Sequence, residues 1–324
     1  MPLNPLVHTL LSTPLSAFSC FCLSFHFFKK IKFHNIWEEI SFRYTLGLGF
    51  HMTGVFILGL CHAIHSATII AWTLIPFVFL QTYLPSFKRI FQSLRPIVLR
   101  HRWVLLIGLM FGLPWISFAF YPVTGWDETA IHLSSAKVYL KTGSLPLLEH
   151  FRYPMSVMLN HMLFVTALVI GNDSTTQLLQ FVNTAILGVT LVSIGIRYFH
   201  PVVGWIALAL FIANDSIFLH ASSALVDVGS AIFSTFAVSA FLNWRDDGQK
   251  EWAWIAGLMA GFSTAVKLNT AFMMGILLFV FLFFTLRKNQ KENKWREFLA
   301  FGICFFVIAA PWYIRNWIEI GNPV

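Results

Sequence analysis

Two adjacent carboxylates, Asp127 and Glu128, lie in the stretch YPVTGWDETAIHLSSAKVYLKTGSL (residues 121–145) of a chain that is otherwise mostly apolar. A carboxylate at the mouth of a helical bundle can take a proton from an acceptor hydroxyl if its reach and pKa are suitable. Asp127 is therefore the candidate general base, and Glu128 is the second candidate. The alternative is that both acids stabilise a helix amino terminus, where free N–H groups and the helix dipole favour negative charge.

Four other charged residues border apolar segments and are candidates for binding a substrate phosphate. Asp227 opens the segment DVGSAIF, where an unpaired acid is costly and usually functional, although a helix cap is the alternative. Lys267 in AVKLN either holds a phosphate or extends to the membrane surface. Arg152 in FRYP and Arg315 in YIRNW either bind a phosphate with two hydrogen bonds or anchor in lipid headgroups.

The sequence has no pattern that predicts a metal site or a resident cofactor. His62 and His65 lie on adjacent helical turns beside Cys61, but no carboxylate is near them in the sequence, so we reject a metal site there. The cysteines all lie in apolar segments and are interpreted as packing residues. Motifs of P-loop, serine-hydrolase, zinc-protease and nucleic-acid-binding proteins are absent. We predict no nucleic-acid partner, and the need for a divalent metal stays open.

Composition indicates the elements that must position these side chains. The 324 residues are 57% apolar and 11% charged, and their mean hydropathy is +0.71. Repeated apolar runs near the ~20 residues of a transmembrane helix, without alternating strands, predict an all-α, polytopic membrane protein. The predicted crossings lie near residues 7–28, 44–64, 66–84, 103–120, 178–196, 203–219, 226–243, 252–266, 270–286 and 298–314.

The distribution of positive charge predicts which segments share a side of the membrane. Residues 85–103 and 287–297 are strongly basic, so both are predicted to be cytoplasmic loops. The net charge of +8 is interpreted as this topological bias together with contact with anionic lipid. Residues 121–145 then emerge outside. Between this outer stretch and the second cytoplasmic loop the chain must cross the membrane an odd number of times, but the sequence offers an even number of apolar segments. One segment therefore does not cross, and residues 155–170 are predicted to form this tilted or re-entrant helix.

The outer stretch itself predicts a short interfacial helix from about residue 127 to 141. Thr124 and Asp127 have the spacing of a capping box, Lys137 and Lys141 are one helical turn apart, and Gly143 is typical of a helix end. We divide the chain into N-terminal transmembrane segments with a basic cytoplasmic loop (1–102) and a transmembrane module that carries the candidate residues (103–324). The last four residues, Gly-Asn-Pro-Val, are typical of the start of a loop, so we expect the chain to be cut short there.

Five motifs taken together resemble the membrane-embedded GT-C glycosyltransferases, the superfamily of protein O-mannosyltransferases and lipid A aminoarabinose transferases. They are GWDETAIHLSSAKVYLKTG, FRYP, LVDVGSAIF, GLMAGFSTAVKLN and PWYIRNWIEIGNPV, in that order along residues 103–324. The resemblance implies a GT-C-like bundle and transfer of a sugar from a polyprenyl-phosphate carrier, usually with inversion. It also implies that Asp127 is the first-loop acid, with Glu128 beside it, and that Asp227 and Lys267 belong to the same site, with Arg152 and Arg315 matching less securely.

The resulting hypothesis is a glycosyltransferase of a bacterial cytoplasmic membrane whose site faces outside. Its expected partners are a polyprenyl-phosphate-linked sugar donor, a glycan, lipid or protein acceptor, and membrane lipids. The alternatives are a transporter, flippase or channel for lipid-linked glycans and a catalytically inactive membrane scaffold. A transporter should carry ionisable residues near the bilayer midplane and inverted internal repeats, whereas the charges here collect at one interface.

Overall fold

The computed structural model describes residues 5–25, 27–28, 31–100, 102–151, 156–287 and 294–323, and within these ranges every regular element is a helix. The predicted site residue Arg152 lies outside the described residues. The elements are α1 (Pro5–Leu23), α2 (Ile36–Leu60), α3 (Ser66–Val78), α4 (Leu80–Arg100), α5 (Arg102–Phe118), the π-helical turn η1 (Glu128–His132), α6 (Leu133–Thr142), α7 (Leu159–Ile170), α8 (Asp173–Tyr198), α9 (Pro201–Ile212), α10 (Asp215–Ala221), α11 (Asp227–Asp247), α12 (Glu251–Val266), α13 (Thr270–Leu286) and α14 (Trp295–Ile320).

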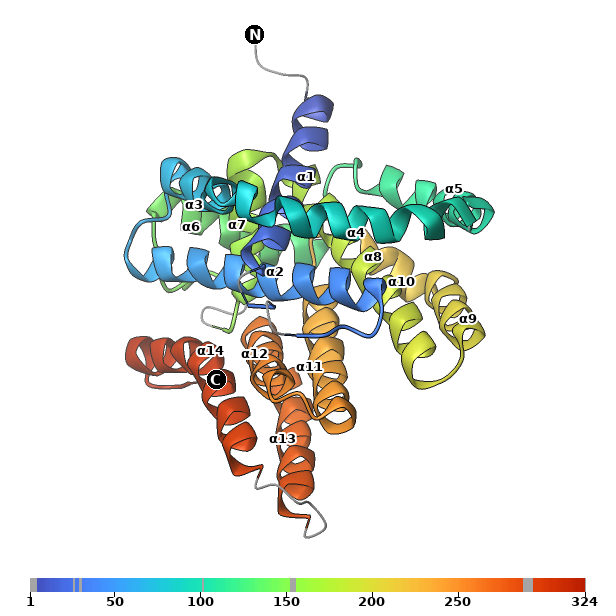
Figure 1. The fold of residues 1–324 in the computed structure, drawn as a ribbon. Helices are drawn as coiled ribbons and strands as arrows, with labels where there is room; N and C mark the ends of the chain where they lie inside the picture. The colour runs from blue at the N-terminus through green and yellow to red at the C-terminus, as the bar shows by residue number, and fades with distance from the viewer. Residues whose placement is uncertain are drawn as a thin grey trace.

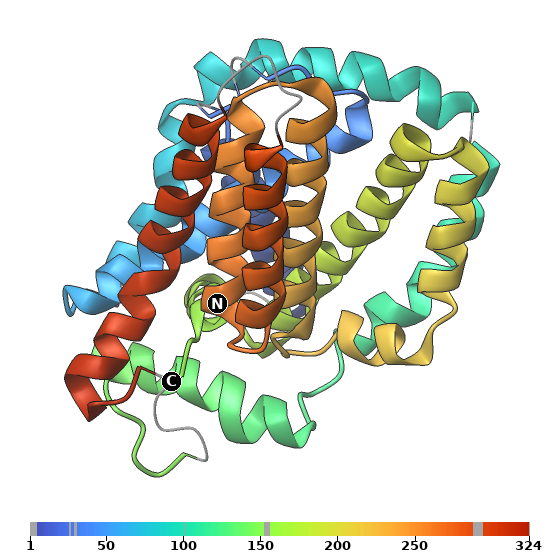
Figure 2. The same ribbon diagram turned by 90° about the horizontal axis from the view of Figure 1, so that it is seen from below.

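The long helices form a bundle whose two ends are covered by helices that lie across it. Figure 1 labels the elements, and Figure 2 shows α4 across one end of the upright helices α11, α12 and α13, with α6 across the other end. We call these the α4 end and the α6 end. The side-chain contacts agree with this division, because Arg89 of α4 pairs with Glu39 near the start of α2, while Lys137 of α6 pairs with Asp173 at the start of α8.

The length and composition of the helices are compatible with a membrane protein. Three of the described helices, α1, α8 and α14, are long and apolar enough to cross a bilayer. Two further pairs of helices are long and apolar enough only when the two helices of a pair are taken together, and each pair is bent: α3 with α4 by 65° and α9 with α10 by 74°. The predicted crossings at 66–84 and 203–219 are therefore broken helices, and up to five spans are supported by length and composition.

The predicted loop at residues 85–103 is wrong, because these residues belong mainly to the helix α4. Phe87, Ile90 and Leu94 lie on one helical face and pack against a small core around Phe25 and Tyr83. The many cations had indicated a loop, but the apolar residues recur at the spacing of an amphipathic helix. This pattern is typical of a helix that lies along a membrane surface, so it favours a bent surface helix over a crossing for the pair of α3 and α4.

Residues 155–170 were predicted not to cross, and the short helix α7 in this segment indeed does not run from one end of the bundle to the other. His161, in its first turn, contacts His132, and the residue after its last turn, Gly171, precedes Asn172, which bonds to Thr9 of α1. Asp173 follows at once and pairs with Lys137 on the helix that begins beside His132. Both ends of α7 therefore lie near the α6 end, and its 12 residues make it short for a crossing.

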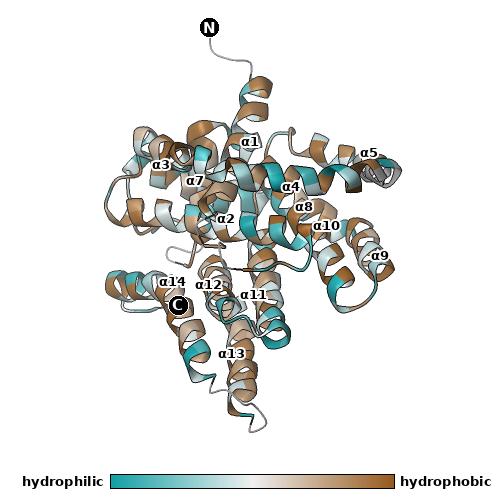
Figure 3. Ribbon diagram, viewed as in Figure 1, coloured by the Kyte–Doolittle hydropathy of each residue, from teal (hydrophilic) through white to brown (hydrophobic). Residues whose placement is uncertain are grey.

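Close helix packing in the second half of the chain depends on glycine. Gly257 and Gly261 of α12 are four residues apart and face α14, where a Cβ on Gly257 would come within 2.2 Å of the carbonyl oxygen of Phe301. Small residues at this spacing allow two helix backbones to approach closely, as in membrane helix pairs. On the outside, Figure 3 shows α13 to be hydrophobic over most of its length. Its Phe272 and Phe279 are 77% and 71% exposed, which is typical of a lipid-facing surface.

Candidate active site

The candidate base Asp127 lies on a helix at the α6 end, and the adjacent residue Glu128 fixes this helix to the rest of the bundle. Residues 126–142 are continuously helical, which confirms the predicted helix at 127–141, and they include the π-helical turn η1. Glu128 is buried, and its two carboxylate oxygens accept hydrogen bonds from the backbone N–H of Gly125 at 3.0 Å and of Ala224 at 2.5 Å. Since Ala224 lies three residues before the first residue of α11, Glu128 ties the loop after α5 to the segment that leads into that helix.

The predicted capping box is displaced by one residue. Asp127 has helical backbone angles and makes no side-chain capping bond, whereas the Glu128 carboxylate accepts from Gly125 N. The capping acid is therefore Glu128, three residues after Gly125, instead of an Asp127 paired with Thr124. A Cβ at Gly125 would lie 2.4 Å from the Glu128 carboxylate, so a larger residue there would force that carboxylate to move out of its capping position. Asp127 is left exposed with its carboxylate outside the cap.

Asp227 and Lys267 form a direct ion pair. Asp227 is the first residue of α11, and Lys267 is the residue that ends α12. Because these two helices pack side by side and run in opposite directions, the start of one lies beside the end of the other, and Lys267 Nζ lies 2.6 Å from Asp227 Oδ1. About two fifths of each side chain remains exposed, at 36% and 43%, so the pair is accessible from outside the bundle.

His132 lies close to both this ion pair and Asp127. Burial lowers the pKa of His132, the charges of Asp127 and Asp227 raise it, and that of Lys267 lowers it, so all three groups lie within electrostatic range of one imidazole. The net effect is a lowered pKa, which favours the neutral ring at pH 7. Asp127 immediately precedes the π-helical turn and His132 ends it, and such turns are frequent at functional sites.

His132 and His161 are site residues that the sequence reasoning missed. Nδ1 of His132 lies 2.8 Å from Nε2 of His161, which is buried in α7. Beside His161, the side-chain amide of Asn160 is buried and makes no hydrogen bond to any described residue. Its oxygen lies 2.3 Å from the position that a Cβ on Gly229 would take. The signal in the sequence was the polar pair Asn160–His161 within an apolar segment, which we interpreted only as evidence against a crossing.

Arg315 lies at the same end but bonds elsewhere. Its side chain is buried, and Nη2 donates to the carbonyl oxygens of Leu145 at 2.5 Å and Pro146 at 3.5 Å. The guanidinium therefore fastens the loop after α6 to α14, and no contact between it and the other candidate side chains is recorded among the described residues. Within the described part of the chain, no three His, Cys, Asp or Glu side chains are arranged to hold a metal ion.

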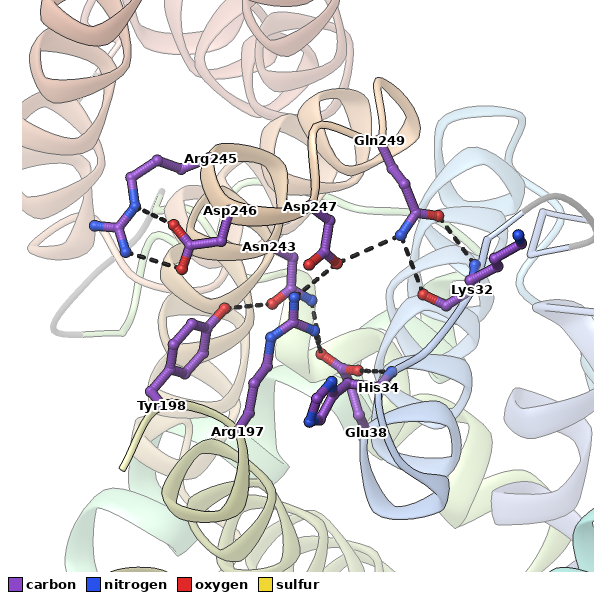
Figure 4. Close-up of polar contacts among 10 residues, drawn as sticks. All are labelled: Lys32, His34, Glu38, Arg197, Tyr198, Asn243, Arg245, Asp246, Asp247 and Gln249. Carbon is purple, nitrogen blue, oxygen red and sulfur yellow. Dashed lines mark hydrogen bonds and ion pairs between the residues drawn. The ribbon is translucent and has the colours of Figure 1, made fainter. Parts of the chain in front are cut away.

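A second polar cluster occupies the α4 end and differs in character (Figure 4). Arg197 of α8 is buried and pairs with Glu38 at 2.5 Å and with Asp247 at 2.6 Å. Glu38 also accepts from the amide of Asn243, at 2.7 Å, and from the backbone N–H of His34, at 2.7 Å. The 20 residues of α11 between Asp227 and Asp247 separate the two clusters by about 30 Å at 1.5 Å per residue, the thickness of a bilayer core.

Comparisons with protein-family models, curated proteins and solved structures return no match for this chain. The resemblance to GT-C glycosyltransferases therefore rests on the five sequence motifs alone. Four of them meet at the α6 end: GWDETAIHLSSAKVYLKTG, LVDVGSAIF, GLMAGFSTAVKLN and PWYIRNWIEIGNPV.

Proposed function

We propose that this protein is a membrane glycosyltransferase that moves a sugar from a polyprenyl-phosphate-linked donor to a glycan, lipid or protein acceptor. The observation that carries the proposal is the meeting of Asp127, His132, Asp227 and Lys267 at the α6 end. An exposed carboxylate, a neutral imidazole and a partly exposed cation are the groups that a displacement at a sugar phosphate needs.

In the proposed reaction, Asp127 takes the proton of the acceptor hydroxyl as its oxygen attacks the anomeric carbon. The bond from that carbon to the phosphate oxygen breaks, and its electron pair leaves with the carrier phosphate. Lys267 stabilises the negative charge that the phosphate gains, and Asp227 holds the ammonium group in place until the donor binds. Glu128, with both oxygens bonded to backbone N–H groups, positions Asp127.

The ion pairs of the described residues support an enzyme over a transporter. They lie near the two ends of the bundle, as in Asp227–Lys267 at the α6 end and Glu38–Arg197 at the α4 end. A transport path would favour ionisable pairs near the midplane. The transporter alternative predicts that purified protein moves a lipid-linked glycan between the leaflets of vesicles without transferring the sugar.

We place the α6 end outside a bacterial cytoplasmic membrane, because the basic segments of the sequence lie at the α4 end. Single cysteines at Lys141 and Lys250 test this after the native cysteines are replaced. An impermeant thiol reagent should label the first in intact cells and the second only after lysis. The opposite result would invert the topology and remove the site from the outer face.

The test of the chemistry is Asp127→Asn in the full-length protein, reconstituted with undecaprenyl-phosphate-linked mannose or aminoarabinose. We expect transfer to fall at least about 100-fold, the contribution of a general base, while the melting temperature stays unchanged because Asp127 is exposed and makes no capping bond. Glu149→Gln, an exposed acid at the same end, is the matched control and should keep full transfer. Unchanged transfer by Asp127→Asn would remove this residue from the role of base.

A further inference from the structure

A cavity of about 660 Å³ lies at the α4 end, between α4 and the segment that leads into α2. One wall is a face of α4 made by Ser86, Arg89 and Ser93, which are spaced three and four residues apart. The opposite wall includes Lys32, and Arg43 of α2 also lines the cavity. It is about 30 Å from the candidate active site by the length of α11, so it belongs to a different part of the molecule.

The charges that line this cavity do not balance. Three cations, Lys32, Arg43 and Arg89, face one carboxylate, that of Glu39. Both arginines bond to the same oxygen of that carboxylate: Arg43 through Nε at 2.9 Å and Nη2 at 2.9 Å, and Arg89 through Nη2. The sequence between residues 24 and 37 contains no acid that could supply a second anion.

Arg43 makes this imbalance costly. It is 5% exposed, and its guanidinium lies over the ring of Phe25 at 4.4 Å, yet its Nη1 has no hydrogen-bond partner among the described residues. A buried charged donor without a partner is destabilising unless an anion completes its environment. A phosphate group carries enough charge and enough acceptor oxygens to engage two arginines at once.

The surroundings of the cavity point to a membrane lipid as the source of that phosphate. Along α4 the exposed apolar residues Leu84, Phe91 and Val98 are spaced by seven, and so are the exposed cations Lys88 and Arg95. This pattern is typical of a helix that lies at the level of lipid headgroups. The cavity opens beside that helix, where headgroup phosphates are concentrated.

We propose that the cavity between α4 and residues 31–36 binds the phosphate headgroup of an anionic phospholipid. In this site Arg89 and Lys32 contact the phosphate first because they are exposed at its rim. Arg43 donates its free Nη1 to the phosphate from below, while its Nε and Nη2 stay bonded to Glu39. The bound lipid would fix α4 against α1 and α2.

The experiment compares charge-matched double variants of the full-length protein. Lys32→Gln with Arg89→Gln removes two cations of the cavity, whereas Lys88→Gln with Arg95→Gln removes two cations of the same region outside it. Each protein is placed in phosphatidylcholine nanodiscs with increasing phosphatidylglycerol, and the bound anionic lipid is counted by native mass spectrometry. We expect the first double variant to lose at least about tenfold in lipid affinity and the second to lose less than about threefold.

Two further measurements test whether the cavity binds a lipid phosphate. Ser93→Glu places a carboxylate one turn from Arg89, so it should raise the melting temperature in pure phosphatidylcholine and abolish the response to phosphatidylglycerol. Inorganic phosphate is added in a separate arm. Equal losses in the two double variants would mean unspecific attraction, and stabilisation by free phosphate equal to that by lipid would assign the site to a soluble phosphate. Either result would overturn the proposal.

Discussion

Glu128→Gln tests whether Glu128 positions the site or reacts in it. The carboxylate has two acceptor oxygens, and each receives one backbone N–H, from Gly125 and from Ala224. Glutamine keeps one acceptor and turns the other position into an NH₂ donor, so one buried N–H would face a donor. The side chain is also 7% exposed, which leaves little access for water to compensate.

The expected magnitude follows from these two bonds. A hydrogen bond to a charged group contributes about 1.5–3 kcal/mol, and a buried donor left unpaired costs a similar amount. Since glutamine keeps one bond in its weaker neutral form, we expect the free energy of unfolding to fall by about 2–3 kcal/mol. That corresponds to a decrease of about 3–4 °C in melting temperature for a chain of this size.

The assay is thermal unfolding in detergent together with sugar transfer, with Glu149→Gln as the control of equal charge change. We expect Glu128→Gln to melt earlier and to transfer more slowly, with an unchanged pH profile, because Asp127 still takes the proton. If Glu128→Gln melted like the wild type but lost transfer, Glu128 would be the base, and our assignment of a positioning role would be wrong.

Three further perturbations test the fold and its electrostatics. Arg197→Gln leaves the buried carboxylate of Glu38 without its cation and should cost about 3–5 kcal/mol of unfolding free energy, whereas the surface variant Arg245→Gln should change it by less than about 0.5 kcal/mol; chemical denaturation of both compares them. Gly257→Ala should lower the melting temperature by forcing two backbones apart, while Gly275→Ala, in open space, should leave it equal or slightly higher; equal shifts would contradict the close packing. Because burial lowers the pKa of His132, the unfolded chain binds the proton more readily, so stability should fall as the pH drops below about 6.5. His132→Asn should reduce that fall between pH 7.5 and 5.5, and an unaltered slope would exclude His132 as its source.

The sequence predicted that the candidate residues lie together better than it predicted their contacts. Positive charge and crossing parity put Asp127, Asp227 and Lys267 on one face, and these residues do gather at one end of the bundle. The pairing of Asp227 with Lys267 required the antiparallel packing of α11 and α12, which no local pattern contains. His132 and His161 are 29 residues apart and each looks isolated in the sequence, so only the folded chain shows their contact.

The carboxylate pair shows the limit of spacing arguments. Capping-box spacing fitted Thr124 and Asp127, yet the cap is made by Glu128 one residue later. The deciding interaction is the bond from Ala224 N to Glu128, across 96 positions of sequence. Residues 85–103 were wrongly predicted to be a loop for a different reason. The prediction relied on their many charges and overlooked the apolar residues of α4, which recur with helical spacing.

The Glu38–Arg197 network and the cluster of Asp127, Asp227 and Lys267 differ in how completely their charges are satisfied, and this difference separates a structural from a functional cluster. At the α4 end, Glu38 accepts from Arg197, Asn243 and the backbone of His34, and the network is buried. Such a network holds helices together but has no remaining capacity for a substrate. At the α6 end, Asp127 is exposed and makes no capping bond, and the pair Asp227–Lys267 is about two fifths exposed. Charges in this state cost little to redirect toward a ligand, because exposed ion pairs contribute only about 0–1 kcal/mol to stability. Substitutions in the Glu38–Arg197 network should therefore alter stability before activity, and substitutions of Asp127 or Lys267 should alter activity before stability.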